Sequence, residues 1–500
     1  MAKDTILINV DIGETRVALL EDGVVGELHI ERTRDRSPVG NIYLGKVMRV
    51  LPGMQAAFID IGLDRAAFLH VEDLVAPEGS GTGDEADKRK SARNRVSRST
   101  PIRDVLKEGQ KLLVQVSKGP IGTKGARVTS HFSMPGRYVI YMPTVDHIGV
   151  SKRIGTDSER ARLKAAIEAI KPPGGGVVIR TLANGLTKKK LKADIGFLVN
   201  AWQAASDKAK NTRKAPRLVH EEPDIVLRAA RDMFTEDVAS IVVDDRPTYE
   251  RLLAFLQDFL PERAGDVEFY EGAEPLYDEY GVEDEIARAL SRRVPLPSGG
   301  YLIIDQAEAL TAIDVNTGRF TGKGKDVTET ILLTNLEAVQ EIAYQLRFRN
   351  IGGLLVLDFI DMDKQAHRDR VYKNLREALK RDKAKTTVVR VSELGLVEMT
   401  RKRTHESLGR TLYEPCFFCD GTGQLQSKET ICHEIFRQMR REKEGLPGYE
   451  ITVQAHPAVC DMLEREERLT LQKAEKLFER RIVLKPRKDY HLEQFDLRAK

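Results

Sequence analysis

Three polar residues in the second half of the chain have the types and spacing that suit a divalent cation. Asp314 and Asn316 share one face of the alternating run 310–316, because successive side chains of a strand point to opposite faces. Asp358 directly follows the apolar run 354–357. Carboxylates at neighbouring strand ends suit Mg²⁺, which takes one or two of them and fills its other positions with water and substrate phosphate. The alternative is that both acids cap helices or close salt bridges.

A Cys-x-x-Cys motif, Cys416 to Cys419, is followed by a glycine-rich turn sequence and resembles a zinc knuckle. Two thiolates do not complete a tetrahedral site. Either Cys432 and His433 complete it within the chain, or a second chain contributes its own pair. The other interpretations are a pair of ordinary buried cysteines and a thioredoxin-like redox motif. We disfavour the redox motif because no βαβ pattern opens here.

Aromatic and basic residues recur in the first quarter of the chain. Phe58 and Phe68 lie ten residues apart, and Lys118 and Lys124 follow. Aromatic rings stack on unpaired bases and lysines meet phosphates, which is the usual composition of a strand-binding barrel surface. The alternative is that both rings belong to a core. Two further basic runs, 188–190 and 401–403, are interpreted as solvated faces.

These residues need elements to position them, and the first 130 residues favour strands. The runs 5–10, 15–21 and 24–31 predict a meander whose sheet is completed later in the chain. Short runs then predict a small barrel, with a flexible insertion at 76–101. The barrel strands are expected at 42–51, 56–60, 66–69 and 111–117.

The remainder alternates helix and strand patterns and predicts layered α/β domains. Residues 303–305 and 310–316 are expected to pair as antiparallel strands, and an apolar stripe predicts a long helix from Leu332 to Leu346. The run 354–357 predicts a strand buried on both faces. Asp363 is expected to cap the next helix. Beyond residue 423 the pattern is helical and highly charged.

Composition sets outer limits on these interpretations. The 500 residues carry 80 basic and 76 acidic side chains. Because these charges nearly balance, an anionic partner would have to bind a locally basic part of the surface. Four cysteines do not make a disulfide framework, which favours a reducing compartment. The first ten residues lack the apolar core of a signal peptide, and no run approaches the roughly 18 apolar residues of a membrane span. We expect a soluble cytoplasmic protein.

Read in order, the motifs resemble the ribonuclease E/G family, over about residue 5 to the C-terminus. Each string alone is weak, but together they are highly specific. Because the chain ends at residue 500 without a long scaffold tail, it is most similar to the shorter members of the family. The carrying strings are 41–47 (NIYLGKV), 56–62 (AAFIDIG), 311–316 (TAIDVN), 334–338 (TNLEA), 352–362 (GGLLVLDFIDM) and 396–401 (LVEMTR).

The resemblance implies a multidomain α/β fold in which an RNase H-like domain is interrupted by an OB-fold. The implied domains are an RNase H-like part at 1–37, an OB-fold RNA-binding domain at 38–130, a 5′-sensor with the remainder of the RNase H-like domain at 131–222, a DNase I-like catalytic domain at 223–412, a zinc link at 413–424 and a small α-rich dimerisation domain at 425–500.

The resemblance also implies residue roles. Asp314 and Asp358 match Mg²⁺ ligands, with Asn316 in the same catalytic site, and Cys416 and Cys419 match structural Zn²⁺ ligands shared between chains. The matching RNA-contacting and 5′-monophosphate-binding residues are Phe58, Phe68, Lys118 and Lys124, and Arg180, Thr181, Gly136 and Ile140, respectively.

The function that follows is a Mg²⁺-dependent endoribonuclease that cuts single-stranded RNA, stimulated by a 5′-monophosphate. The family acts in rRNA and tRNA processing and mRNA turnover, as a homodimer or homotetramer. The alternative is a non-catalytic RNA-binding scaffold, and a metal-dependent phosphatase is disfavoured because it leaves the barrel aromatics without a role. A scaffold would not need Asp314, Asn316 and Asp358 together, so we favour the enzyme.

Overall fold

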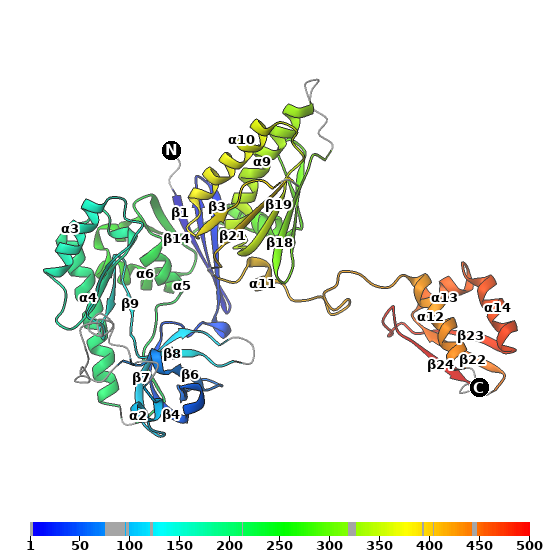
Figure 1. Cartoon of the computed structure of the whole chain (residues 1–500), viewed down its shortest axis with the longest axis horizontal. Helices are drawn as coiled ribbons and strands as arrows, with labels where there is room; N and C mark the ends of the chain where they lie inside the picture. The colour runs from blue at the N-terminus through cyan, green and yellow to red at the C-terminus, as the bar shows by residue number, and fades with distance from the viewer. Residues whose placement is uncertain are drawn as a thin grey trace. The chain divides into compact units, whose positions relative to one another are not determined.

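A computed structural model describes residues 4–75, 96, 100–120, 124–212, 214–318, 327–392, 395–403, 405–442 and 448–500. The chain forms two compact units, Met1–His405 and Glu406–Lys500 (Figure 1). Most of the predicted insertion at 76–101 lies outside the described residues. None of the helices described is long and apolar enough to cross a membrane.

The N-terminal meander belongs to a five-stranded sheet that is completed by segments more than 200 residues later. Strand β1 pairs antiparallel with β2 and parallel with β14, so the predicted later completion of the sheet is confirmed. Its strands, in spatial order, are β15 (Val267–Phe269), β14 (Val238–Val243), β1 (Asp4–Asp11), β2 (Glu14–Glu21) and β3 (Val24–Arg32).

Helices α5 (Ile225–Asp232) and α6 (Arg246–Phe259) pack their apolar side chains against this first sheet. Residues 223–269 therefore complete the sheet of the N-terminal meander and do not belong to the six-stranded sheet formed by residues 293–401. The boundary expected at residue 223, where the catalytic domain was predicted to begin, is wrong because residues 223–269 belong to the first sheet. The parallel pairing of β1 with β14 is the reason, because strand neighbours in a sheet need not be neighbours in sequence.

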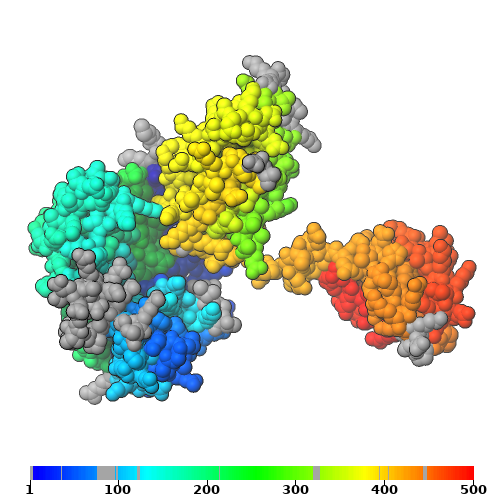
Figure 2. All heavy atoms as spheres, in the orientation of Figure 1, coloured from blue at the N-terminus to red at the C-terminus, as the bar shows by residue number. Residues whose placement is uncertain are grey.

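The next strands close into a five-stranded barrel. Figure 2 shows the atoms of this part of the chain in blue to cyan. Closure comes from antiparallel pairing of the first barrel strand with β7. The interior is apolar and includes Val47, Ile59, Leu69 and Val116. The strands, in order, are β4 (Ile42–Leu51), β5 (Ala56–Asp60), β6 (Ala67–His70), β8 (Arg127–Thr129) and β7 (Lys111–Lys118), with β13 (Arg217–His220) added beside β4.

A small α/β layer follows the barrel. Its four-stranded sheet carries α3 (Asp157–Glu168) and the long α4 (Lys188–Lys210), whose apolar residues share one core with the strands. Thr156 accepts a hydrogen bond from Glu159 N–H and so caps α3. The strands, in order, are β11 (Ile148–Val150), β12 (Gly176–Ile179), β10 (Val139–Met142) and β9 (Met134–Pro135).

The last sheet of the first unit has six strands, and the predicted antiparallel pair at 303–316 is confirmed. Short helices α7 (Leu276–Glu279) and α8 (Val282–Leu290) precede it. Its strands, in order, are β16 (Arg293–Pro295), β17 (Tyr301–Gln306), β18 (Leu310–Asn316), β19 (Gly353–Asp358), β21 (Leu396–Arg401) and β20 (Thr386–Val388).

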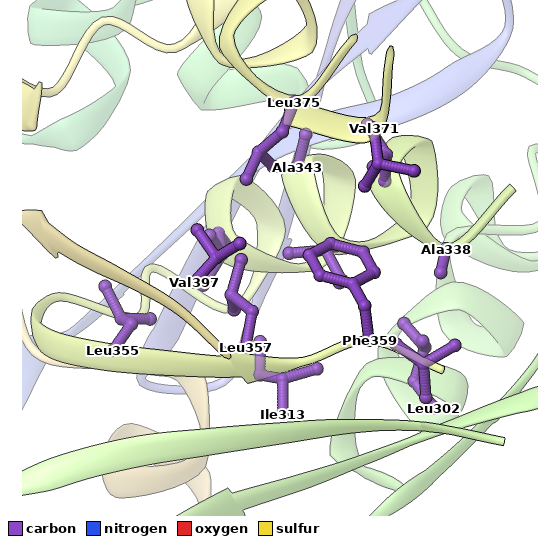
Figure 3. Close-up of a cluster of buried hydrophobic side chains, with 14 of the residues drawn as sticks. Leu302, Ile313, Ala338, Ala343, Leu355, Leu357, Phe359, Val371, Leu375 and Val397 are labelled. Atoms are coloured by element: carbon purple, nitrogen blue, oxygen red, sulfur yellow. The ribbon is translucent and has the colours of Figure 1, made fainter. Parts of the chain in front are cut away.

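Helices α9 (Val327–Phe348) and α10 (Gln365–Ala378) cover only one face of this sheet. Figure 3 shows the core between this sheet and the two helices, with Ile313, Leu355 and Leu357 pointing from the strands toward the helices. Leu354 is 48% exposed on the opposite face. The strand expected to be buried on both faces is therefore buried on one, and its apolar run does not distinguish the two cases.

Two local expectations for this sheet are also wrong. Helix α10 has Lys364 at its N-cap with no side-chain cap, so Asp363 does not cap it. Arg401 is 5% exposed and forms an ion pair with Asp382, so it is not part of a solvated basic face.

The second unit combines helices with a three-stranded sheet, so the expected helical tail is incomplete. Strands β22 and β23 pair in parallel, and two helices connect them. The elements are α11 (Leu408–Leu412), α12 (Lys428–Arg441), β22 (Glu450–Ala455), α13 (Pro457–Glu464), α14 (Arg468–Phe478), β23 (Arg481–Pro486) and β24 (Phe495–Ala499). Helix α12 packs on the same core as β22, as the shared burial of Ile435 and Val453 indicates.

Candidate active site

Parallel pairing of β18 and β19 places Asp314 directly beside Asp358. Both side chains are exposed on the face that α9 and α10 leave open. Asn316 Nδ2 donates a hydrogen bond to Asp314 Oδ2 at 2.8 Å, which orients that carboxylate. The structure thus brings together the three residues of the predicted site. Neither acid caps a helix, because both lie within strands.

The electrostatics at this pair favour a cation. Partial burial raises the pKa of Asp358, and the negative charges of Asp314 and Asp361 raise it further. All three causes act against the ionised form, whereas a bound cation would stabilise it. Exposed carboxylate oxygens on a rigid sheet are the donor type that Mg²⁺ takes, so the residues fit this ion.

The barrel aromatics lie outside the barrel core. Phe58 and Phe68 are register partners on β5 and β6, with ring centroids 6.2 Å apart at 70°. Both are half-buried, whereas their sequence neighbours Ala57, Ile59 and Leu69 fill the interior. Strand alternation therefore turns the two rings outward, where bases can reach them.

Cations flank this aromatic pair. In register, Arg49 lies opposite Phe58, Phe68 lies opposite Arg127, and Arg127 lies opposite Lys118. Arg49, Lys118 and Arg127 are exposed, and Arg127 pairs with Asp73 at 2.7 Å. Lys124 is also exposed, three residues before β8. No motif marks Arg49 and Arg127 in the sequence, because only strand register reveals this row.

The residues matched to a 5′-phosphate pocket gather at the ends of β12 and β10. Arg180 Nη1 donates to Gly136 O, and Arg180 N donates to Tyr138 O at 2.8 Å. The Thr181 hydroxyl lies 3.2 Å from the Ser151 hydroxyl. Ile140 is half-buried on β10, two residues beyond Tyr138.

Glycine is required at 136 by its surroundings. A Cβ there would lie 2.7 Å from both carboxylate oxygens of Asp194. That carboxylate accepts hydrogen bonds from three consecutive backbone N–H groups, of Arg137, Tyr138 and Val139. Burial still raises the pKa of Asp194. The buried Asp194 carboxylate thus stabilises the turn in which Gly136 O accepts a hydrogen bond from Arg180.

An acidic partner of Arg180 was not foreseen. Asp232 Oδ1 lies 2.6 Å from Arg180 Nη1, and Asp232 Oδ2 lies 3.0 Å from Arg231 Nη2. Burial raises the pKa of Asp232, but the two arginines outweigh this effect and hold the pKa below its usual value. No motif marks Asp232 in the sequence, since its contact with Arg180 spans 52 positions.

The cysteine motif forms a tight turn. Gly421 N donates to Cys416 O at 3.0 Å, and Gly423 N donates to Cys419 Sγ at 3.2 Å. Both glycines have positive φ, +79° and +72°. The Gly423 hydrogen bond is the main cause that lowers the pKa of Cys419, which favours the thiolate that Zn²⁺ requires.

The intrachain completion of this site is not what the structure shows. Cys432 is fully buried in the core of the second unit, and burial raises its pKa to about 12. Among the residues described, His433 instead groups with Glu429 and Glu467, with their ligand atoms all within 4.8 Å of one another. In the part of the chain that the structure describes, Cys432 does not group with Cys416 and Cys419.

Comparison with known proteins decides the family. A model of the ribonuclease E/G family matches residues 133–404, and a model described as RNase E/G, thioredoxin-like domain matches residues 415–500. The chain belongs to the ribonuclease E/G family.

Curated relatives agree over almost the whole chain. The chain is 44% identical to ribonuclease G of Escherichia coli over 492 residues, which are 98% of this chain and 99% of that protein. It is 42% identical to ribonuclease G of Haemophilus influenzae over 493 residues, 98% of each chain. Ribonuclease E of Escherichia coli is 38% identical over 432 residues, which are 86% of this chain but 39% of that protein.

The thioredoxin-like match points to a feature that the sequence pattern did not predict in the C-terminal part of this family member. A parallel β22–β23 pair connected by helices lies beyond the cysteine motif, whereas the motif itself lies between α11 and α12, where no βαβ unit opens. The sequence pattern did not predict this strand pair, because the polar residues of the helices at 428–441 and 468–478 dominate the composition of the segment.

Proposed function

We propose that this endoribonuclease of the ribonuclease E/G family cuts single-stranded RNA by Mg²⁺-dependent hydrolysis at Asp314 and Asp358. The observation that carries the proposal is the register pairing of the two acids on the open face of the sheet. When bound, Mg²⁺ supplies a Lewis acid and a water of lowered pKa.

The protein's part in this reaction is to hold the metal ion and to orient its carboxylate ligands. Asp314 and Asp358 would hold the ion, and the Asn316 amide fixes the Asp314 carboxylate through the 2.8 Å hydrogen bond. Water oxygen adds to phosphorus and the P–O3′ bond breaks, which leaves a 5′-phosphate on one product and a 3′-hydroxyl on the other. No ribose 2′-hydroxyl is required as nucleophile.

Substrate binding is assigned to the barrel. Outward-facing Phe58 and Phe68 provide stacking surfaces for two unpaired bases, and Arg49, Lys118 and Lys124 provide charge for the backbone. A duplex keeps its bases stacked on one another, so this surface favours single strands. The proposed cellular role is processing of rRNA and tRNA and turnover of mRNA, in the cytoplasm.

The proposed 5′-end pocket consists of Arg180, Thr181, Gly136 and Ile140. A guanidinium binds a terminal monophosphate through two parallel N–H···O hydrogen bonds, whereas a 5′-hydroxyl end carries no charge for it to bind. Because this contact lies away from the scissile bond, its binding energy should appear mainly in KM. The proposed Zn²⁺ link uses Cys416 and Cys419, shared with a second chain in a dimer or tetramer.

The test of catalysis uses a 5′-labelled single-stranded oligonucleotide with Mg²⁺ or with EDTA. Asp314→Asn and Asp358→Asn keep the side-chain shapes but remove charge, so cleavage should collapse while RNA binding persists. Asp305→Asn is the matched control, because Asp305 is a carboxylate of the same sheet that is ion-paired with Arg292. Near-normal turnover in either site variant would refute the assignment of catalysis to these two acids, and no cleavage by the unaltered protein with Mg²⁺ would favour the non-catalytic scaffold.

A further inference from the structure

Asp232 lies between two arginines at the C-terminal end of α5. Its Oδ1 is 2.6 Å from Arg180 Nη1, and its Oδ2 is 3.0 Å from Arg231 Nη2. One carboxylate therefore connects the proposed 5′-phosphate pocket to the helix that packs on the first sheet.

The arginine on the far side of Asp232 is firmly held. The Arg231 side chain is 8% exposed, and its Nη1 donates to Glu222 Oε1 at 2.8 Å and to Pro135 O at 3.1 Å. Helix α5 itself is anchored by Val226 and Ala230 in the core of the first sheet. Asp232 is thus held by Arg231 independently of its contact with Arg180.

The two side-chain hydrogen bonds of Arg180 both use Nη1, one to Gly136 O and one to Asp232. Within the described ranges of the chain, no residue accepts a hydrogen bond from its Nε or Nη2. The side chain is 26% exposed, so this second edge of the guanidinium can meet a ligand. An arginine binds phosphate through two parallel N–H groups on one edge, which is what remains available.

We infer that Asp232 is a positioning residue that fixes Arg180 so that its Nε–Nη2 edge receives a 5′-terminal phosphate. The inference rests on the proposed 5′-end pocket. A free arginine loses much rotamer freedom on binding, and an arginine already held by Asp232 and Gly136 O loses less.

The opposite role is physically distinct. If Asp232 acted only as a counter-charge, it would weaken the attraction between Arg180 and a phosphate, and its neutralisation would strengthen the 5′-monophosphate preference. The geometry favours positioning, because Asp232 engages Nη1 and leaves the bidentate edge open. The two roles predict changes of opposite sign.

The experiment compares cleavage of matched RNAs with a 5′-monophosphate or a 5′-hydroxyl by the full-length protein. Rates are normalised to a circular RNA, which has no end, so that a general loss of folded enzyme cancels. Asp232→Asn and Asp232→Ala should lower the monophosphate preference by about tenfold, mainly through KM, as expected for a lost charge-assisted hydrogen bond. Asp232→Glu keeps the charge and should restore part of the preference.

A double variant tests whether Asp232 acts through Arg180. Arg180→Gln alone should narrow the preference, and adding Asp232→Asn should lower the remaining preference no further, because the two residues act as one unit. Glu159→Gln is the control, since it removes an ion-paired carboxylate from α3 in the same part of the chain and should leave the preference intact.

Two failures are distinguishable. If Arg180→Gln keeps the full monophosphate preference, the 5′-end pocket is refuted and the inference is refuted with it. If Arg180→Gln narrows the preference but Asp232→Asn keeps or increases it, or if the two losses are additive, the pocket stands and the positioning role of Asp232 is refuted.

Discussion

Phe58 and Phe68 face each other across neighbouring antiparallel strands on the outside of the barrel, with ring centroids 6.2 Å apart. The edge-to-face geometry fixes two aromatic surfaces at once. Their sequence neighbours fill the barrel interior, so the rings contribute less to the core than their size suggests. This arrangement separates RNA affinity from stability in a way that can be measured.

Phe58→Ala should weaken single-stranded RNA binding by about 1–3 kcal/mol, because a stacked base loses its aromatic partner. The Tm should fall only slightly. Phe132→Ala is the matched control: Phe132 is buried, packs on Trp202, and should cost about 3–5 kcal/mol of stability with normal affinity per folded molecule. A Phe58→Ala protein that is unstable but binds RNA normally would contradict the stacking role.

The raised pKa of Asp358 predicts a pH-dependent stability in metal-free protein. The folded state disfavours the ionised acid, so stability should fall as pH rises from the ordinary pKa of the carboxyl group through its raised folded value. Asp358→Asn should remove this group's contribution to the pH dependence of stability and be slightly more stable than wild type at neutral pH. Denaturant unfolding at a series of pH values measures both.

Added Mg²⁺ provides the control for this prediction. The ion should stabilise wild type and have little effect on Asp358→Asn, because the ligand charge is gone. Its affinity for wild type should weaken as pH is lowered through the raised pKa, since protons compete for the carboxylate. Equal pH slopes and equal Mg²⁺ effects in the two proteins would contradict the metal assignment.

The zinc link predicts a stoichiometry. Sharing of Cys416 and Cys419 between two chains gives half an equivalent of zinc per chain, since one ion takes four thiolates. Cys416→Ser combined with Cys419→Ser should release the metal and loosen the oligomer. Metal analysis and sedimentation measure the two effects, and Cys432→Ser should leave the zinc content unchanged because Cys432 lies in the core.

One full equivalent of zinc per chain, retained on dilution to monomers, would exclude the shared site.

A stability prediction concerns the buried ion pair of Asp382 and Arg401, whose side chains are 3% and 4% exposed. Asp382→Ala should destabilise the protein by about 3–5 kcal/mol, because it leaves a buried guanidinium without its charge partner. Asp305→Ala removes the partner of an exposed arginine, Arg292, and should change stability little. Similar losses in the two variants would show that the pair of Asp382 and Arg401 is not effectively buried.

Periodicity alone located many strands of the first unit, because an alternating or apolar run of strand length is a local property. The residues 310–316 and the stripe from Leu332 to Leu346 are examples, and both form the expected elements. Local pattern failed at Leu354, where an apolar side chain lies on an open face. It also failed at 450–455, whose strand is separated by charged helices from its parallel partner.

The sequence by itself determined the residue types at the site: two acids and an amide at strand ends, two spaced aromatics, and a cysteine pair. The tertiary structure decided their neighbours. Strand register placed Asp314 beside Asp358 and Arg49 beside Phe58, and a contact across 52 positions placed Asp232 on Arg180. Periodicity reports which face a residue occupies, whereas register and long-range packing depend on which segments bury their apolar surfaces against one another.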